Sequence, residues 1–403
     1  MVRPLLFAIA ALIPIPAAAQ NTPEPPPSNS EEIANVRVPS WGKSIIDSFS
    51  APVHPVVGGV VSGGGVGFGV GYDSPADTGW YRHGLALMTV KRYWALEGEI
   101  GRRSASNRSA IAVFGNMRHM NRIDFFGIGP GTPFDDRSTF RLRDATVGTS
   151  GWYRFRPALR AGGTMSAYLP DIGSGANRAL PSIEERFSES RVPGGLFSQP
   201  MFGRYRGFAE LTYPVINDPD ASEGADVYQG TYQVAAELVR DHSTGRHDFH
   251  RWETEVLQRI PGFQSGQRLT LHGLVASTNT NADVPYYMLY TLGGSGGLKA
   301  FRPDLLGTDG TQATLRGYRN YRFRDRDLLL MQAEYRIPLH RHVHATVFVD
   351  SGQVAPQVAE LFRDIKTTTG FSLSYMNKGK TLGRMDVGFG GEGVQIFWSF
   401  GAF

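Results

Sequence analysis

Apolar and polar residues alternate along most of the chain after residue 20, in segments of roughly ten residues separated by Gly, Asp, Asn, Ser and Pro. A period of two is typical of β-strands whose two faces meet different surroundings. The alternation predicts strands at 63–72, 80–91, 92–103, 108–118, 143–156, 158–168, 202–213, 228–241, 246–258, 266–277, 285–292, 326–338, 342–352, 366–376, 383–391 and 393–403.

These candidate strands suit a membrane barrel better than a soluble sandwich. No run after residue 20 holds 18 consecutive apolar residues, so no membrane-spanning helix is expected. An even number of strands of this length, joined by alternating short and long connections, is typical of outer-membrane barrels. The pattern predicts an all-β fold, a 16-stranded transmembrane antiparallel β-barrel.

The two ends of the predicted barrel have distinct faces. In the segment 63–72, one face consists only of glycines, and such a row suits a strand against which another backbone must lie. Those glycines are Gly63, Gly65, Gly67, Gly69 and Gly71. In the last segment, Val394, Ile396 and Trp398 share one apolar face, and the chain stops at the aromatic Phe403. We expect the glycine segment to be the first strand, at a weak seam, and the last segment to close the barrel.

The first 55 residues are expected to lie outside the barrel. Residues 1–19 have the pattern of a secretory signal peptide, with Arg3 before a short apolar run and small residues at 17–19. Residues 20–55 are rich in Pro and Ser at their start and are expected to form a periplasmic linker. The barrel is expected to occupy residues 56–403.

Composition narrows the classes of function. The chain has no Cys, which excludes disulfides, Cys-ligated zinc and iron–sulfur clusters. Glycine is abundant, at 49 of 403 residues, and aromatic residues make up 11%. The formal net charge of +4 is too small to indicate nucleic acid binding.

Two patterns suggest chemistry but are weak. Residues 293–297 match a G-x-S-x-G motif, but a nucleophile elbow needs an α/β sheet, which the strand pattern does not predict. His340, His342 and His344 could line one strand face and bind a metal. They flank a predicted short turn, however, and turn residues are the simpler interpretation. We expect no catalytic residues, no metal and no cofactor, and therefore no enzyme.

Several motifs near the C-terminus occur in the order found in one family. They are Leu292-Gly293-Gly294, Leu315-Arg316-Gly317-Tyr318, residues 332–338 (QAEYRIP) and residues 347–352 (VFVDSG). With these motifs, residues 56–403 resemble the Omp85 superfamily of outer-membrane barrels, also called bacterial surface antigen D15-like proteins. The resemblance implies a barrel that aids insertion or translocation of protein or lipid at the bacterial outer membrane.

The resemblance also implies a latch between a long loop and the barrel wall. In the family, the loop that carries the motif folds into the lumen, and its Arg pairs with acidic residues of the inner wall. Carried over, Arg316 would reach Glu334 and Asp350, with Gly317 and Tyr318 beside it. Without the resemblance, Arg316 would be interpreted as a solvated loop residue. An Arg fork does suit carboxylates in a lumen.

Two features depart from the family pattern. The segment before the barrel is too short for a POTRA domain, so a barrel-only member is expected, with a periplasmic partner as one possible source of that function. About twenty residues separate Gly294 from Leu315, and residues 297–301 resemble a degenerate copy of the motif. Which part forms the loop tip is left open.

Three functions remain open from sequence. The loop motif favours assistance to protein or lipid passage through a weak seam between the first and last strands. A passive pore is the alternative, with outer-membrane lipid as the surroundings in both cases and no nucleic acid partner. A membrane-bound enzyme would need a catalytic set that the sequence does not present.

Overall fold

The computed structural model of this chain describes residues 52–61, 63–74, 79–176, 179–192, 194–214, 228–279, 281–294, 312–313, 315–377 and 380–400. The expected signal peptide, nearly all of the expected linker and Phe403 lie outside the described residues. Within the described part of the chain, no helix is both long and apolar enough to cross a membrane.

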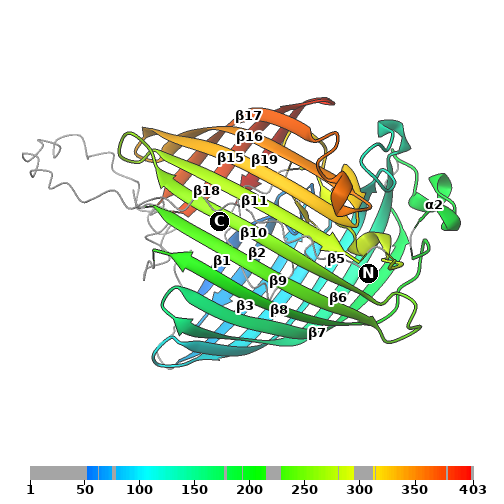
Figure 1. The fold of residues 1–403 in the computed structure, drawn as a ribbon, viewed down its shortest axis with the longest axis horizontal. Helices are drawn as coiled ribbons and strands as arrows, with labels where there is room; N and C mark the ends of the chain where they lie inside the picture. The colour runs from blue at the N-terminus through cyan, green and yellow to red at the C-terminus, as the bar shows by residue number, and fades with distance from the viewer. Residues whose placement is uncertain are drawn as a thin grey trace, which may run out of the picture. The chain divides into compact units, whose positions relative to one another are not determined.

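Sixteen strands form one antiparallel sheet that curves into a barrel, which confirms the predicted fold class (Figure 1). The sheet follows the chain from β1 to β11 and then β15 to β19. Its strands are β1 (Val53–Gly58), β2 (Gly67–Asp73), β3 (Trp80–Thr89), β4 (Trp94–Arg103), β5 (Ser109–Phe125), β6 (Ser138–Arg156), β7 (Leu159–Ser174), β8 (Phe202–Tyr213), β9 (Gln229–Asp241), β10 (Phe249–Pro261), β11 (Arg268–Thr278), β15 (Asp327–His340), β16 (Val343–Ala355), β17 (Lys366–Asn377), β18 (Lys380–Gly390) and β19 (Gly393–Phe400).

The connections differ between the two ends of the barrel. One end carries mostly short turns, such as residues 157–158 and 341–342, and one longer connection at 214–228, together with the start of β1 and the end of β19. The other end carries long connections, with α2 (Ile183–Arg186) in the one between β7 and β8 (Figure 1). Short single-turn helices occur at η1 (Phe134–Asp136), η2 (Glu189–Arg191), η3 (Tyr286–Met288) and η4 (Val358–Glu360). We call these the short-turn end and the long-loop end.

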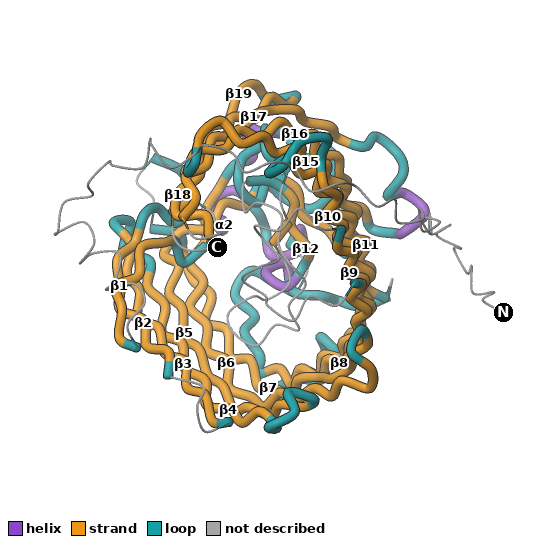
Figure 2. Tube along the Cα trace, turned by 90° about the vertical axis from the view of Figure 1, so that its left-hand side faces the viewer, coloured by secondary structure: helices purple, strands orange, loops and turns teal. Residues whose placement is uncertain are grey.

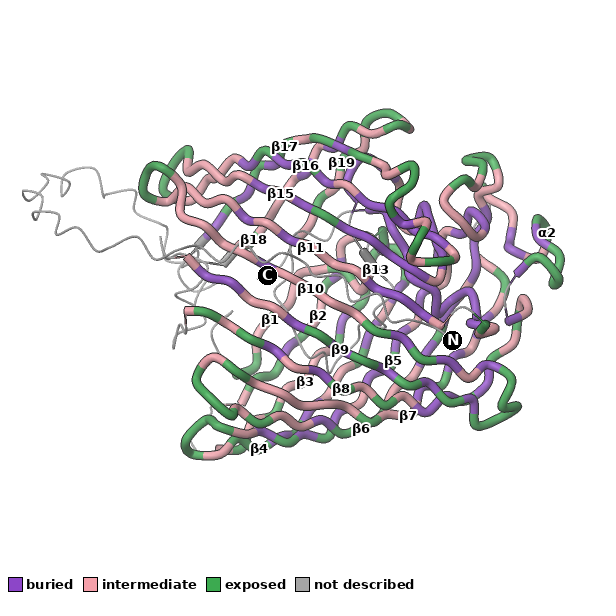
Figure 3. The backbone as a smooth tube through the Cα atoms, viewed as in Figure 1, coloured by how far each residue is buried: buried purple, intermediate pink, exposed green. Residues whose placement is uncertain are grey.

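Burial alternates along the strands as the sequence pattern predicts. On β5, Ala112 and Phe114 are buried, whereas Ile111 and Val113 expose 66% and 57% of their surface. Because neighbouring residues of a strand point to opposite faces, the exposed apolar side chains lie on the outer wall. Buried residues concentrate toward the long-loop end (Figure 3).

The sixteen strands are not quite the sixteen predicted. Fifteen candidate segments overlap barrel strands, but residues 285–292 do not belong to the barrel sheet. They hold η3 and β12 (Tyr290–Leu292), which pairs with β13 (Gln312–Ala313) and β14 (Phe323–Asp325) in a separate small sheet. The missing strand is β1, which begins at Val53, before the expected start of the barrel.

The glycine run is not the first strand, so the prediction that it forms the seam strand is wrong. Gly63 and Gly65 lie in the β1–β2 connection with φ of 77° and 83°, which a side chain would strain. Gly67, Gly69 and Gly71 lie on β2, the second strand. A Cβ at Gly69 would lie 2.1 Å from a backbone oxygen of β3. The row therefore admits close backbone approach between neighbouring strands.

The described parts of the connection between β11 and β15 lie within the ring of strands (Figure 2). An aromatic cluster packs this segment against the inner wall near the long-loop end. Tyr286 of η3 makes edge contacts with Phe125 of β5 and Phe140 of β6, at ring-centroid distances of 5.3 and 5.0 Å. The described residues around Tyr286 are thus packed into the barrel and not solvated.

Candidate functional site

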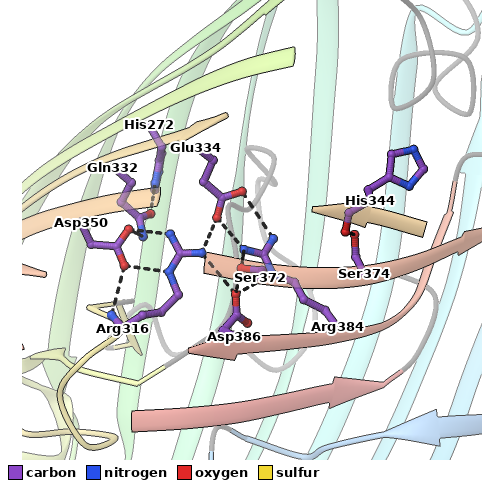
Figure 4. A network of polar contacts seen from close by, with 10 residues as sticks. All are labelled: His272, Arg316, Gln332, Glu334, His344, Asp350, Ser372, Ser374, Arg384 and Asp386. Atoms are coloured by element: carbon purple, nitrogen blue, oxygen red, sulfur yellow. Dashed lines mark hydrogen bonds and ion pairs between the residues drawn. The ribbon is translucent and has the colours of Figure 1, made fainter. Parts of the chain in front are cut away.

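Arg316 is the centre of a buried ion network on the inner wall (Figure 4). Its Nε and Nη2 donate to the two carboxylate oxygens of Asp350 on β16, at 2.7 and 2.6 Å. Its backbone N–H donates to the same carboxylate at 3.1 Å. The guanidinium and carboxylate therefore meet fork to fork, which fixes orientation as well as charge.

The same guanidinium reaches two more strands. Nη1 donates to Glu334 of β15, and it lies 3.4 Å from Asp386 of β18. Arg384 of β18 bonds both of these carboxylates, with 2.7 Å from Nη2 to Glu334 and 2.7 Å from Nε to Asp386. Two cations thus face three carboxylates.

Burial makes this network costly to break. Arg316 and Asp350 expose 0% of their surface, and the Arg316 guanidinium lies 3.5 Å from the centroid of the Phe348 ring. Burial alone would lower the pKa of Arg316, but Glu334, Asp350 and Asp386 raise it, so the side chain stays protonated. Removing one partner of such a pair leaves an uncompensated buried charge.

The loop backbone docks where β18 lacks side chains. A Cβ at Gly388 would lie 2.6 Å from the Gly317 nitrogen, and a Cβ at Gly390 would lie 2.5 Å from the Gly317 oxygen. Gly317 has φ of 112°, and a Cβ there would lie 2.9 Å from Thr368 of β17. Glycines on both sides therefore permit direct contact between loop and wall.

The Leu292-Gly293-Gly294 motif lies against residues 315–318. The N–H of Gly294 donates to the carbonyl of Tyr318 at 3.3 Å, and Gly294 also bridges to Leu315. The Tyr318 ring meets that of Phe323 edge-on at 5.1 Å between centroids. The two limbs of the loop are therefore held together beside Arg316. Residues 295–311, which include the possible degenerate copy, lie outside the described residues.

A second network joins the part of the loop before residue 295 to β10, and through β10 to β9. The Tyr290 hydroxyl donates to Glu253 of β10 at 3.0 Å. Arg251 of β10 donates to the Met288 carbonyl at 3.4 Å and to Glu237 of β9 at 2.6 Å. The loop is thus bonded to β10 on one side, where Glu237 of β9 braces Arg251, and to β15, β16 and β18 on the other.

The structure brings Arg316, Glu334 and Asp350 together and places Gly317 and Tyr318 next to them. Sequence reasoning missed Arg384, Asp386 and the docking glycines Gly388 and Gly390. The available signal was in the segment 383–391 itself, where two charged residues precede two glycines at alternate positions. Nothing in the motifs connects those positions with the loop.

The seam between β1 and β19 is short and lightly joined. The two strands stand at the ends of the sheet order and approach within 8 Å, but none of the pairings between described residues joins them. They are six and eight residues long. Asp73 donates its N–H to the Pro52 carbonyl, so by alternation Pro55 directs its nitrogen toward the seam. Since proline has no N–H, one donor is missing from that edge.

The histidines near residue 340 do not form a metal site in the described structure. His340 ends β15, while His342 lies in the following turn and bonds the Met376 carbonyl through Nδ1 at 3.0 Å. His344 lies on the next strand, β16, and not on the same strand as His340. No group of three or more His, Asp and Glu residues that could hold a metal is found among the described residues.

Asp325 lies on β14, outside the barrel strands, and is expected to make the stability of the fold depend on pH. Burial raises the pKa of Asp325 to about 6. A carboxylate with a raised pKa in the folded state binds its proton more tightly there than in the unfolded chain, so its ionisation destabilises the fold above that pKa. We expect the stability difference between wild type and Asp325→Asn to shift in favour of wild type as pH falls from 7.5 to 5.

Between pH 7.5 and pH 5 the shift is expected to be about 1.4 kcal/mol, because a pKa of about 6 places about one pH unit of the proton linkage above pH 5, at 1.36 kcal/mol per unit. Thermal melts of both proteins in detergent across this pH range measure it. Asparagine keeps the oxygen that accepts the Arg326 N–H, at 2.8 Å in the wild type, and removes only the titration. Parallel pH profiles for the two proteins would contradict the prediction.

Comparison with known proteins identifies the fold only. No family model matches the sequence, and no curated protein matches it. The structure is similar to BamA from Haemophilus ducreyi lacking POTRA domains 1–3, with 11% identity, a TM-score of 0.59 and coverage of 87% of this chain and 69% of that one. It is also similar to CdiB from Escherichia coli (11% identity, TM-score 0.56) and from Acinetobacter baumannii (9%, 0.51). Each alignment covers 87% of this chain, but only 63% and 59% of the CdiB chains.

These likenesses agree with the family that the sequence motifs suggest. BamA and CdiB are barrels of the Omp85 superfamily. At the level of the fold, the predicted resemblance is confirmed, and the chain has the barrel fold that BamA and CdiB share.

Proposed function

We propose that this protein is an Omp85-type barrel of the bacterial outer membrane that helps polypeptide, or lipid, to insert into or cross that membrane. The observation that carries the proposal is the combination of an anchored loop and a lightly joined seam. The loop is anchored on the inner wall through Arg316 and Asp350 of β16, and the seam lies beyond β19, three strands further along the sheet. We further propose that it acts without covalent chemistry and that export depends on the signal peptide at residues 1–19.

The outer wall supports a place in a bilayer. Trp94 and Arg102 mark two levels on β4, and the outward residues between them include Leu96 and Ile100, with 49% and 54% of their surface exposed. Eight residues of strand span roughly 27 Å, or roughly 20 Å in height when tilted by about 40°. This approaches the apolar band of outer-membrane barrels, which is about 25 Å tall.

The seam supplies a route for strands or polypeptide. An edge that lacks one donor and a short partner strand are easily separated, because few hydrogen bonds must be broken. The Arg316 network includes β18, the neighbour of β19, so the loop also braces the wall beside the seam. We propose that a partner in the periplasm supplies the recruitment of the substrate.

A passive pore is the second candidate, but the anchored loop argues against it. A porin needs a stable open lumen, whereas here Tyr290 is bonded to β10 and Arg316 is bonded to β15, β16 and β18. A large, steady single-channel current from the reconstituted wild-type protein would favour the pore.

The experiment that tests the proposal uses a disulfide across the seam. The chain has no Cys, so an engineered pair is free of competing thiols. Val57→Cys is combined in turn with Cys at positions 394, 396 and 398, which lie on the same outward face, and the combination that cross-links is kept. The oxidised protein in liposomes is expected to lose its acceleration of the membrane insertion of an unfolded outer-membrane barrel.

Reduction of the same sample is the matched control, because it restores the seam without changing the sequence. Recovery of the acceleration after reduction would support the proposal. Equal acceleration by oxidised and reduced protein, or none by the wild type, would contradict it.

A further inference from the structure

A row of charged and aromatic side chains crosses the outer wall near the long-loop end. Four directly opposed residues on neighbouring strands form it, from β4 to β7: Trp94, His119, Arg143 and Asp171. Trp94 and His119 stack with 5.9 Å between ring centroids. The Arg143 Nε lies 3.4 Å from His119 Nδ1. The row is therefore continuous across four strands.

This row lies immediately above the apolar wall. Two residues further along each strand, toward the short-turn end, are Leu96, Met117 and Leu169, which expose 49%, 46% and 44% of their surface. Since alternate residues share a face, both levels point outward. Charge begins where the outward apolar residues end, which is the position of headgroups in a bilayer.

Together with the next level toward the loops, the row carries more positive than negative charge. Arg141, one level nearer the loops, bonds Asp171 at 2.9 Å, and Arg143 lies 3.7 Å from the same carboxylate. Two guanidinium groups thus share one carboxylate, and their side chains expose 30% and 48% of their surface. On β9, outside this row, the charges balance: exposed Arg240 pairs with the carboxylate of Asp248.

More basic residues continue the charge at the adjacent rim. Lys91 lies in the turn between β3 and β4, and its pKa is lowered by burial and then by Arg122 and Arg137. Arg137 bonds Asp124 at 2.8 Å. This surface therefore has three more basic than acidic residues. The acidic residues are Asp124 and Asp171, and the basic residues are Lys91, Arg122, Arg137, Arg141 and Arg143.

We propose that this surface, on the outer wall of β4 to β7 at the long-loop end, binds the phosphate groups of a lipid headgroup. A phosphate oxygen suits the Arg fork, and the lipid chains would lie on the apolar wall directly below. Trp94 lies at the level where amphipathic rings favour the interface. The inference rests on the proposed membrane location, and it adds a lipid partner that the seam and latch do not require.

The test compares lipid retention by the full chain reconstituted in phosphatidylcholine nanodiscs. Bisphosphorylated lipid A is the probe, and native mass spectrometry counts the molecules retained. Wild type is expected to retain several-fold more lipid A than the double variant Arg141→Gln, Arg143→Gln, and the difference is expected to shrink at high salt. Arg240→Gln is the matched control and is expected to behave as wild type.

Three results would overturn the proposal. They are equal retention by wild type and the double variant, an equal loss with Arg240→Gln, and displacement of lipid A by inorganic phosphate at the same concentration. Failure of every variant to enter nanodiscs would instead overturn the membrane location in the proposed function. Insertion without lipid preference would leave that function standing and reject only this surface.

Discussion

Arg316→Ala is expected to release the loop from the inner wall and to produce a larger, steadier single-channel current than the wild-type protein. The side chain bonds Asp350, Glu334 and Asp386 at once, and its loss removes three strands' contacts with the loop. Asp350, with 0% exposure, would retain a buried charge whose main cation is gone. Such losses cost about 3–5 kcal/mol, so the melting temperature is expected to fall as well.

Arg341→Ala is the matched control, because Arg341 is exposed in the short turn between β15 and β16. It is expected to leave both current and melting temperature unchanged. Asp350→Ala combined with Arg316→Ala should cost less than the sum of the single changes, since the uncompensated charge is then gone. A wild-type current already large and equal to that of Arg316→Ala would reject the latch.

The barrel could be predicted from sequence because its walls meet two different surroundings. Outward Ile111 and Val113 alternate with inward Ala112 and Phe114, and this period of two is visible without any neighbour in space. The segment 285–292 was wrongly predicted as a barrel strand, because its apolar residues are buried for a different reason. Its tyrosines are buried against the inner wall, and a short apolar run does not distinguish a strand from a packed loop.

The first strand escaped prediction for the opposite reason. Residues 53–58 contain Pro55, which argues against a strand in a sequence but is tolerated at the free edge of a sheet. Only the sheet order identifies β1 as an edge. The alternating glycines of residues 63–72 were therefore predicted to be the first strand in its place.

The site was predictable only where a motif named it. Arg316, Glu334 and Asp350 lie in segments that resemble family motifs, whereas Asp386 and Arg384 complete the same network from a strand without one. Their role depends on the curvature that brings β18 to the loop. Sequence separation hides it, since 70 residues divide Arg316 from Asp386.

A single methyl group on β18 should test the docking of the loop without removing any charge. In Gly388→Ala, the added Cβ would lie 2.6 Å from the Gly317 nitrogen and 2.7 Å from the Arg316 carbonyl carbon. Neither atom is the end of a flexible side chain, so the loop backbone must move away from the wall. Overpacking of this kind costs about 1–3 kcal/mol.

The expected result is a current like that of Arg316→Ala, together with a smaller fall in melting temperature. All five charged groups of the network remain in this variant, so a change in current would come from the position of the loop and not from an unpaired carboxylate. Gly98→Ala is the matched control, because a Cβ at this strand glycine would meet no atom within 4 Å. If Gly388→Ala conducts as the wild type does while Arg316→Ala does not, the ion network would hold the lumen by charge alone and the backbone contact would be incidental.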